Sequence, residues 1–526
     1  MMSGVPPSDA FHVYDTTLRD GAQREGMSLS VNDKLAIARH LDDLGVGFIE
    51  GGWPGANPKD TEFFRRARTE LSLTTAQLTA FGSTRRPGGE VAADLAPLRE
   101  SGAGVVCMVA KSDVRHVERA LRTTREENLA MIRDSVAHLR AEGQRVFLDA
   151  EHFFDGHVAD PAYALEVLRT AADAGADVVV LCDTNGGMLP HRLAEIVHEV
   201  VGTGLRVGIH AHNDAACAVA NSLAAVQAGA THVQGTANGY GERCGNADLF
   251  SVVAALQVKG GREVLPPGRL VELGRVAHAV AEVANIAPDP HQPWVGASAF
   301  AHKAGLHVSA IKADPDLYQH TDPAVVGNDM RLLVSELAGR ATIELKGRAL
   351  GLEPDRETVG RIVERVKDLE SVGYSFEAAE ASFELLLREE MGQRPHYFDL
   401  ESWRVIVERR ADGEIVSEAT VKLHAKGERI VATGEGNGPV NALDKALRLA
   451  LEKLYPSLAA LELVDYKVRI VSGAHGTDAV TRVLVETTDG TSEWDTVGVH
   501  ENVIAASWQA LEDAYTTGLL REGVDG

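Results

Sequence analysis

The chain has 526 residues, with 76 acidic side chains against 52 lysines and arginines, for a formal net charge of -24. This charge repels a phosphate backbone, so it argues against a general nucleic-acid binder and requires a local basic pocket for any anionic substrate. A hydrophobic content of 44% is typical of a globular chain that is too long for one ordinary domain, and no apolar run reaches the ~18 residues that a membrane span needs.

The N-terminal end and the cysteines indicate the compartment. The first ten residues, MMSGVPPSDA, have neither the basic start nor the apolar core of a secretory signal. The four cysteines, Cys107, Cys182, Cys217 and Cys244, are scattered and contain no C-x-x-C pair. They fit reduced thiols better than a disulfide framework or a thiolate zinc site. We therefore expect a cytoplasmic protein.

One pattern recurs through the first half of the chain: a helical stretch, a glycine, a short spacer and an apolar strand. It occurs in LDDLGVGFIE, LRESGAGVVC and AADAGADVVV, among other segments. The glycines stand where the C-terminus of a helix favours a left-handed residue. They are Gly45, Gly102, Gly143, Gly175, Gly204 and Gly229. The strands that follow are nearly continuous apolar runs, which is typical of a parallel sheet buried on both faces.

These runs predict eight strands, and their number favours a barrel. The strands centre on Val13, Phe48, Leu78, Val106, Phe147, Val179, Val207 and Val233. Eight strand–helix units over roughly 250 residues match the size of a (β/α)8 TIM barrel. An open doubly wound sheet uses the same alternation, but it usually needs fewer strands, and no G-x-G-x-x-G follows the first one.

Beyond the barrel the pattern changes twice within this α/β chain. We expect a catalytic barrel over residues 1–287, helical linker subdomains over 288–390 and a C-terminal regulatory and dimerisation domain over 391–526. In the last part, alternating half-exposed strands precede the helical stretches PVNALDKALRLALEKL and VIAASWQALEDAY. Aligning Ala442 with Ala506 predicts a duplicated βα unit in an α+β domain. This domain has no obvious catalytic cluster, so regulation or dimerisation is the predicted role.

Polar residues gather where the predicted barrel strands end, which is where active sites of such barrels lie. His210 and His212 are two residues apart on the seventh strand, so both rings face one point. Two imidazoles with the carboxylate of Asp20 suit a divalent metal such as Mn²⁺, Zn²⁺ or Mg²⁺, and Asn246 offers a carbonyl oxygen. The alternative interpretation is a hydrogen-bond network that caps the mouth of the barrel.

Three residues near the strand ends have both a catalytic and a structural interpretation. Arg19 beside a metal would stabilise a developing enolate or alkoxide, or it forms a structural ion pair with Asp20 or Glu25. Glu151 is a general base, or orients one, or is a hydrogen-bonded core carboxylate. Thr184 binds a substrate carboxylate, or it makes a turn after the preceding aspartate.

Several motifs resemble one enzyme family. LRDGAQ followed by Lys34, together with HAHND and GERCGNAD, resembles the metal-dependent enzymes that condense an acyl-CoA with a 2-oxoacid. These are the 2-isopropylmalate, homocitrate and citramalate synthases of the DRE-TIM metallolyase superfamily, whose barrel is shared with 3-hydroxy-3-methylglutaryl-CoA lyase. Ala216 stands where a glycine is common. The resemblance covers essentially the whole chain, and EGGWPGANPKD, AFGSTRR and DAEHFFDG resemble the citramalate synthase branch.

The resemblance implies a Claisen-type condensation of acetyl-CoA with pyruvate that gives (R)-citramalate and CoA, an entry step to isoleucine biosynthesis. It implies a divalent metal as cofactor and acetyl-CoA as co-substrate. Metal ligands would be Asp20, His210, His212 and Asn246. Arg19 and Glu151 would be catalytic, and the substrate would be bound by Arg19, Gln23 and Thr184.

The linker is implied to contribute to the same reaction. His307 and Tyr318 match residues that reach over the barrel, where His307 would help to remove a methyl proton from acetyl-CoA with support from Glu242. By itself a lone histidine in a helical region has a structural interpretation, and His302 is a competing histidine. Basic residues that are candidates for contacts with CoA are Arg85, Arg86, Lys111 and Lys303, although a solvated surface charge is the more common role of such residues.

The final domain resembles the regulatory domain of these synthases, which implies an amino-acid effector and a homodimer. We expect small-molecule substrates and no nucleic-acid or membrane partner. Alternatives are the same chemistry on 2-oxoisovalerate or 2-oxoglutarate, a lyase or aldolase, and a non-catalytic amino-acid-binding regulator. The long C-terminal domain argues against a catabolic lyase, and the intact set Arg19, Asp20, His210 and His212 argues against a non-catalytic scaffold.

Overall fold

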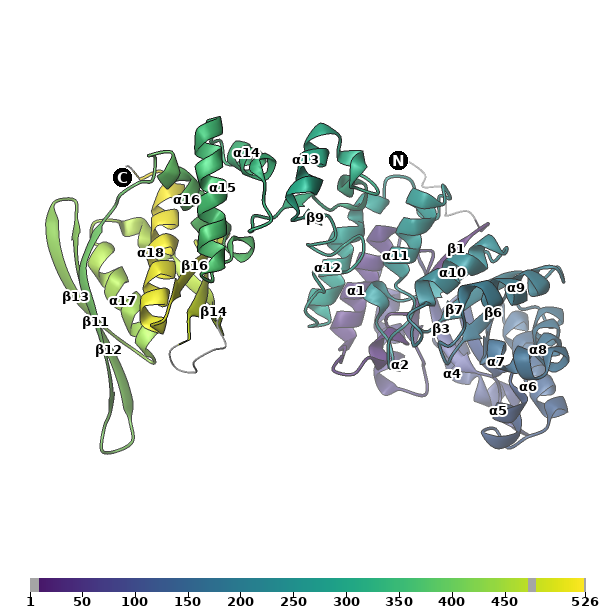
Figure 1. Ribbon diagram of the computed structural model, residues 1–526. Coiled ribbons are helices and arrows are strands. Elements are labelled where there is room, and N and C mark those ends of the chain that lie inside the picture. The colour runs from purple at the N-terminus through teal and green to yellow at the C-terminus, as the bar shows by residue number, and fades with distance from the viewer. Residues whose placement is uncertain (1–8, 472–478, 525–526) are drawn as a thin grey trace. The chain divides into compact units, whose positions relative to one another are not determined.

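The computed structural model describes residues 9–471 and 479–524. The first ten residues, in which we found no secretory signal, therefore lie mostly outside the described residues. The chain divides into two compact units (Figure 1). The first consists of Met1–Phe300 and Thr321–Asp329, and the second of Ala301–His320 and Met330–Gly526. The domain boundaries expected after residues 287 and 390 stay predictions.

The first unit contains a closed barrel of eight parallel strands in chain order, so the predicted TIM barrel is confirmed. A strand lies at each of the eight predicted positions. They are β1 (His12–Asp15), β2 (Phe48–Gly52), β3 (Gln77–Ser83), β4 (Val105–Lys111), β5 (Arg145–Glu151), β6 (Val178–Asp183), β7 (Val207–Ala211) and β8 (His232–Gly235). The barrel closes because β1 pairs with β8, with His12 opposite His232.

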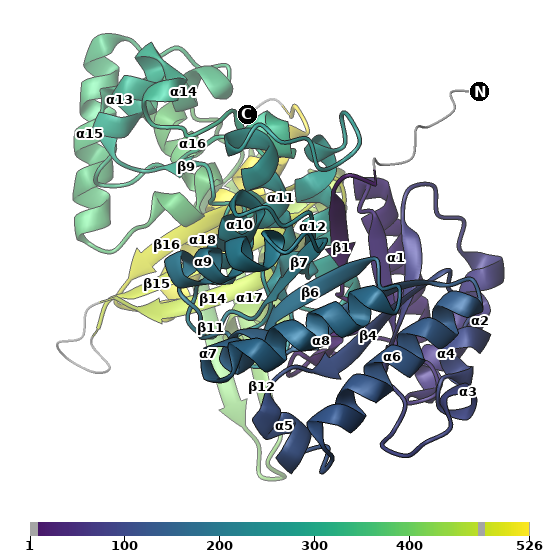
Figure 2. The ribbon, with the colours of Figure 1, turned by 90° about the vertical axis from the view of Figure 1, so that its right-hand side faces the viewer.

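Helices surround the barrel on the outside. They are α1 (Val31–Leu44), α2 (Pro58–Glu70), α3 (Val91–Asp94), α4 (Ala96–Glu100), α5 (Val114–Arg119), α6 (Arg125–Ala141), α7 (Phe153–Ala159), α8 (Pro161–Asp173), α9 (Pro190–Val201), α10 (Ala218–Gln227), α11 (Leu249–Ala254) and α12 (Leu273–Val283). Figure 2 shows α6 and α8 side by side, in keeping with the contacts between them. Short 3-10 helices are η1 (Gly21–Gln23), η2 (Ala237–Gly239), η4 (Leu270–Glu272) and η6 (Pro323–Val326), and η3 (Ala255–Lys259) is a π-helix.

Local sequence signals explain where these helices begin and end. Helix α1 begins with a capping box, in which the Ser30 side chain accepts from the Asp33 N–H and the Asp33 carboxylate accepts from the Ser30 N–H. It ends at Gly45, which has φ of 94°. All six glycines predicted to be left-handed have positive φ. Because this conformation strains any residue with a Cβ, these glycines set the length of each helix before the next strand.

The barrel interior is a packed core rather than a channel. Tyr14, Phe48 and Phe147 meet there, with ring centroids 5.2 Å apart for the two phenylalanines. At the N-terminal ends of the strands, Asp9 pairs with Arg145 and Arg206. Because these side chains fill the N-terminal end of the barrel, we expect an open site at the C-terminal ends of the strands.

The second unit begins with a mainly helical segment. It contains α13 (Gly305–Ala313), η5 (Pro315–Leu317), α14 (Arg340–Ala349), α15 (Arg356–Ser371), η7 (Phe376–Ala378) and α16 (Glu380–Glu390). Two short strands, β9 (Ala301–His302) and β10 (Arg331–Leu332), pair with each other. A hydrophobic cluster that includes Ile343, Ile362 and Phe383 holds α14, α15 and α16 together.

The rest of the second unit repeats one arrangement of three antiparallel strands and a helix. The first copy is β11 (Asp399–Arg409), β12 (Ile415–Ala425), β13 (Glu428–Gly436) and α17 (Pro439–Leu451), and the second is β14 (Glu462–Ile470), β15 (Thr481–Thr488), β16 (Glu493–His500) and α18 (Val503–Arg521), with η8 (Pro456–Ala460) between them. The aligned residues Ala442 and Ala506 are both fully buried, on α17 and α18 (Figure 1). The predicted α+β fold with a duplicated unit is therefore confirmed.

Two further expectations concern the described residues. In this part of the chain no helix is both long and apolar enough to cross a membrane. The four cysteines all lie within it and are free, with Cys107 and Cys182 buried and Cys244 exposed. The prediction of unpaired thiols is confirmed.

Candidate active site

A cavity of about 400 Å³ lies at the C-terminal ends of the barrel strands. Every strand, or the loop after it, contributes to its lining. The lining residues are Arg19, Asp20, Gln23, Trp53, Phe81, Ser83, Val109, Lys111, Asp149, Glu151, Cys182, Thr184, His210, His212, Glu242 and Arg243. Eight of the predicted site residues are therefore brought to one place, although their roles stay predictions.

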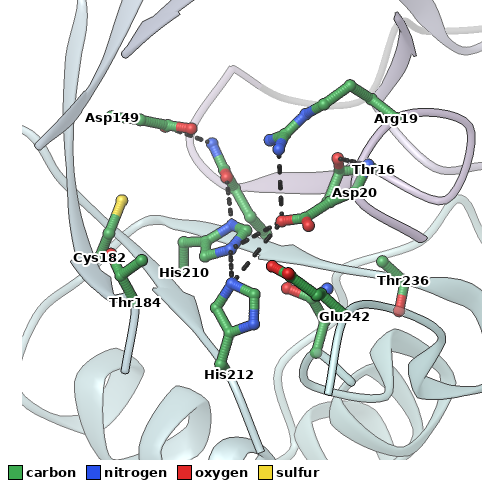
Figure 3. Close-up of polar contacts among 12 residues, drawn as sticks. Thr16, Arg19, Asp20, Asp149, Cys182, Thr184, His210, His212, Thr236 and Glu242 are labelled. Atoms are coloured by element: carbon green, nitrogen blue, oxygen red, sulfur yellow. Dashed lines mark hydrogen bonds and ion pairs between the residues drawn. The ribbon is translucent and has the colours of Figure 1, made fainter. Parts of the chain in front are cut away.

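Asp20, His210 and His212 form a buried cluster in this cavity (Figure 3). Their ligand atoms lie within 4.8 Å of one another. The Nε2 atoms of the two histidines are 3.2 Å apart, and Asp20 Oδ2 lies 3.2 Å from His210 Nε2 and 3.8 Å from His212 Nε2. The expectation that both rings face one point holds. The arrangement brings one carboxylate oxygen and two imidazole nitrogens to a site that a divalent metal would occupy.

Asn246 supplies an observation that fits a metal. A backbone bridge pairs it with His212, and its side chain is 2% exposed. Its amide nitrogen donates to the Tyr240 carbonyl, whereas its Oδ1 is buried and has no hydrogen-bond partner among the described residues. A buried oxygen without a partner is costly, and ligation of a cation would remove that cost. The residues present therefore fit the predicted metal.

The charges around Asp20 keep it ionised. Burial alone would raise the pKa of this carboxyl, but the Arg19 guanidinium and the hydrogen bond from His210 outweigh burial and hold the pKa well below its usual range. The two histidines differ. Burial would lower the pKa of His210, yet its hydrogen bond with Asp20 raises it. Burial and the neighbouring His210 lower the pKa of His212 to about 4.

Arg19 is held rigidly beside the cluster. Its Nε donates to Glu50 Oε2 at 2.6 Å, one terminal nitrogen lies 3.4 Å from Asp20 Oδ2, and its Cζ lies 3.9 Å from the centroid of the Phe81 ring. Burial would lower the pKa of Arg19, but the carboxylates of Glu50 and Asp20 outweigh it and raise the pKa further. The structural ion pair with Asp20 thus exists, and it leaves a fixed cation lining the cavity.

Glu151 is the last residue of β5, and Thr184 directly follows the neighbouring strand β6, so both line the same wall. The Glu151 carboxylate forms an ion pair with Lys111, one of the candidate CoA residues, so this lysine is not a solvated surface charge. Thr184 Oγ1 accepts from the backbone N–H of His152 at 2.9 Å. Gln23 lines the opposite side from the loop after β1 and is exposed.

Glu242 lines the cavity from the loop after β8, and its side chain is 61% exposed. Its neighbour Arg243 also lines the cavity, where it donates to the Asp214 carboxylate and to the Thr184 carbonyl. The loop that follows β8 is therefore fastened to the loops after β6 and β7.

His307 and Tyr318 belong to the second unit. Their rings stack with centroids 4.1 Å apart, His307 being half-buried and Tyr318 41% exposed. The competing His302 lies in β9 of the same unit. Their predicted contribution to the barrel site stays a prediction.

The remaining candidate CoA residues are engaged in ion pairs. Arg85 is buried and pairs with Glu127 and Asp134. Arg86 pairs with Asp94, and Lys303 of the second unit pairs with Glu377. The ion pairs of Arg85 link the segment that follows β3 to α6.

Sequence reasoning missed several residues of the site, among them Glu50, Asp149 and Gln234. Glu50 accepts from the hydroxyls of Tyr14 and Thr16 as well as from Arg19, and Gln234 bridges Asp149 and His210. The available signal was a polar residue inside an otherwise apolar strand, in FIEGG, FLDAE and HVQG. Polar groups buried in such strands need a partner, so they mark a network.

Comparisons with known proteins agree with this architecture. An HMGL-like family model matches residues 10–280, a homocitrate synthase post-HMGL domain-like model matches 294–373, and a LeuA allosteric (dimerisation) domain model matches 377–519. The (R)-citramalate synthase of Streptomyces coelicolor is 69% identical over 522 residues, which is 98% of each chain. The chain belongs to the citramalate synthase family.

More distant relatives of this citramalate synthase family member also match along the full chain. The (R)-citramalate synthase of Aquifex aeolicus is 49% identical over 99% of both chains. A probable 2-isopropylmalate synthase of Methanopyrus kandleri is 35% identical over 96% of this chain and 97% of its own. The resemblance found in the motifs is therefore confirmed, and the two citramalate synthases named here are more similar to this chain than the probable 2-isopropylmalate synthase is.

Proposed function

We propose that this protein catalyses the metal-dependent condensation of acetyl-CoA with pyruvate to give (R)-citramalate and CoA. The observation that carries the proposal is the buried cluster of Asp20, His210 and His212 beside Arg19, at the mouth of a TIM barrel. The relation to the Streptomyces coelicolor (R)-citramalate synthase supports pyruvate as the 2-oxoacid.

Asp20, His210 and His212 would hold the divalent ion, with the Oδ1 of Asn246 as a further ligand. The bound ion, Mn²⁺, Zn²⁺ or Mg²⁺, supplies Lewis-acid polarisation of the ketone and a template for the 2-oxoacid. Gln23 and Thr184 line the same cavity and would bind the substrate carboxylate through their amide and hydroxyl groups.

Arg19 would stabilise the alkoxide that develops on the ketone oxygen when the acetyl carbon attacks. Its guanidinium is already oriented by Glu50 and Phe81, so little reorganisation is needed as charge develops. This is the role in which a fixed arginine is most effective, because its donors form a rigid planar fork.

Carbon–carbon bond formation also requires removal of a proton from the acetyl methyl group. We assign this to His307, supported by Glu242 and Tyr318, and we assign Glu151 as a general base or as the group that orients one. The Lys111 ammonium holds the Glu151 carboxylate at the cavity wall. Hydrolysis of the thioester by water then releases CoA and makes the reaction effectively irreversible.

The apolar residues of the cavity wall favour a small 2-oxoacid as substrate. Trp53, Phe81 and Val109 are its large apolar residues, and the rings of Trp53 and Phe81 meet edge to face with centroids 5.3 Å apart. Pyruvate carries only a methyl group beyond its ketone. A branched substituent adds methylene-sized groups, each of which a pocket of fixed size discriminates by about 1–3 kcal/mol.

The C-terminal domain would make the enzyme a regulated homodimer. Apolar residues on the outer strands are exposed, including Val407, Val431 and Ile470 at 55%, 51% and 62%. A cavity of about 980 Å³, lined by residues of α17, β14 and α18, would take an amino-acid effector. Together with the match to the LeuA allosteric (dimerisation) domain model, these features support a feedback-controlled homodimer, which we propose to be a cytoplasmic enzyme of isoleucine biosynthesis.

The decisive experiment measures CoA release from acetyl-CoA with pyruvate, 2-oxoisovalerate and 2-oxoglutarate in turn, with Mn²⁺ or Mg²⁺ and then with EDTA. We expect metal-dependent turnover with pyruvate. Absence of CoA release with all three 2-oxoacids would refute the condensation.

A second candidate is condensation with 2-oxoisovalerate, which the match to the Methanopyrus kandleri protein favours. A preference for that substrate would keep the mechanism and change the product to 2-isopropylmalate. Preference for 2-oxoglutarate would indicate homocitrate in the same way. Release of CoA in none of these assays, with cleavage of a 3-hydroxyacyl substrate instead, would indicate the lyase alternative.

A further inference from the structure

A fully buried glutamine lies directly behind one of the proposed metal ligands. Gln234 of β8 is 0% exposed, and its Oε1 lies 2.8 Å from His210 Nδ1. Its Nε2 lies 2.9 Å from Asp149 Oδ1 and 3.7 Å from Cys107 Sγ. The four residues lie on β4, β5, β7 and β8, with side chains that meet inside the barrel. In Figure 3, dashed lines mark the two hydrogen bonds that link Asp149 to His210.

The chemistry of the groups sets the direction of each hydrogen bond. A carboxylate only accepts, so the amide nitrogen of Gln234 must face Asp149, where it donates. The amide oxygen then faces His210 and only accepts, so His210 carries its hydrogen on Nδ1. A neutral imidazole has one N–H, so once a cation takes the place of the hydrogen bond between His210 Nε2 and Asp20, the lone pair of the ring lies on Nε2. That atom is the one that faces Asp20 and His212.

We propose that Gln234 is a positioning residue of the metal site, and that Asp149 and Gln234 act as a relay that fixes His210 in the Nδ1–H tautomer. The relay keeps Nε2 of His210 turned toward the ion site, where it faces Asp20 and His212. The proposal rests on the metal site of the proposed function, and it adds two residues to which the sequence analysis gives no role.

The relay has a chemical consequence that a direct carboxylate partner would not have. The neutral amide transmits the orientation of Asp149 to His210, but it keeps the negative charge one residue away from the imidazole. His210 is then a neutral ligand, held in place by hydrogen bonds on both sides of the amide. Partners of this kind commonly change metal affinity by 10–100-fold when they are removed.

A nearby group of possible ligands does not form a second metal site. Glu50, Cys107 and Asp149 also bring ligand atoms within 4.8 Å of one another. However, the Glu50 carboxylate already accepts from two hydroxyls and from Arg19. Asp149 accepts from Gln234, so this cluster is satisfied within the protein and supports the relay.

The test is the affinity of the full-length protein for Co²⁺, measured by titration against a competing chelator and followed by the cobalt absorption bands. Gln234→Met keeps the volume and removes both hydrogen bonds. We expect the affinity for Co²⁺ to fall by about 10–100-fold. The matched control is Gln144→Met, another buried glutamine, whose amide donates to the carbonyls of Leu98 and Ala103. Its affinity should match that of the wild type.

Asp149→Asn separates orientation from charge. The side-chain oxygen that remains at this position can still accept from Gln234, so affinity should stay within about threefold of the wild type, because such partners act by orienting the ligand. If Gln234→Met does not fold, Asp149→Leu replaces it, because loss of the acceptor frees the amide to rotate, and affinity should again fall.

Two results would overturn the relay. One is unchanged Co²⁺ affinity in folded Gln234→Met or Asp149→Leu, and the other is a loss in Asp149→Asn as large as in Gln234→Met. Binding of Co²⁺ by the wild type without CoA release from any 2-oxoacid would instead refute the proposed reaction while the relay stands.

Discussion

Replacing Arg19 with lysine tests the electrostatic part of the mechanism. Lysine keeps the positive charge, but it lacks the planar fork that lets arginine contact Glu50 and Asp20 together while stacking on Phe81. The ammonium can satisfy Glu50 only by leaving the position that faces the cavity. We therefore expect the chemical step to suffer and the site to stay assembled.

The size of the effect follows from the environment of Arg19. Its side chain is only 14% exposed, so its charge is weakly screened by water. Loss of one preorganised donor to a developing oxyanion typically costs about 10²–10³ in kcat, or about 2.7–4 kcal/mol. We expect Arg19→Lys to fall in this range, with little change in metal affinity, because Asp20, His210 and His212 are untouched.

The assay is initial-rate CoA release, followed with a thiol reagent at saturating acetyl-CoA, pyruvate and metal ion. The matched control is Arg85→Lys. Arg85 is a buried arginine of the same barrel that pairs with Glu127 and Asp134 instead of lining the cavity. We expect the control to lose stability and keep its kcat.

A loss in kcat of about threefold or less in Arg19→Lys would refute the assignment. Such a loss is far smaller than the one expected when an oxyanion-stabilising donor is removed. A rise in the KM for pyruvate without a change in kcat would also refute it. That pattern means that Arg19 binds substrate and transition state equally.

Three further predictions concern the metal, the base and the second unit. Removal of the divalent ion with EDTA should abolish CoA release and lower the melting temperature. The melting temperature should fall because a ligand at 100 times its Kd stabilises a folded protein by about 2.7 kcal/mol. Equal melting curves with and without metal would contradict the metal site. Glu151→Gln should reduce kcat by about 10²–10⁴ if Glu151 acts in proton transfer, whereas an unchanged kcat would support its structural interpretation. Burial raises the pKa of Asp513 to about 6 although Arg394 opposes this. The folded-state pKa thus exceeds the unfolded value, so the stability that protonated Asp513 contributes is present below pH 3.8 and is lost as the pH rises through 6. Relative to the wild type, Asp513→Asn should therefore gain up to about 3 kcal/mol between pH 4 and pH 8 in urea unfolding, and parallel pH curves for the two proteins would contradict this.

The barrel was predictable because its signals are local. A glycine with positive φ ends each helix before a strand, as at Gly45, and a strand buried on both faces reads as a continuous apolar run. Strand number then follows from counting. The duplicated unit was predictable for the same reason, since Ala442 and Ala506 occupy equivalent buried positions of two amphipathic helices.

The metal cluster was predictable in part. His210 and His212 are two residues apart on a strand, so their convergence follows from strand geometry alone. Asp20 comes from a turn almost two hundred positions away, and the prediction of its place depended on all parallel strands ending at one rim. Its 3.2 Å approach to His210 was decided by closure of the barrel.

The sequence by itself determined the order of elements, the barrel and the motif residues at its mouth, because these depend on local periodicity and on the side to which strand residues point. Only the tertiary structure decided the partners behind them. Glu50 orients Arg19 from the neighbouring strand, and Gln234 lies between His210 of the adjacent strand and Asp149 across the barrel interior. In the sequence these are single polar residues in apolar strands, and their partners exist only once burial removes water and requires each polar group to find a neighbour.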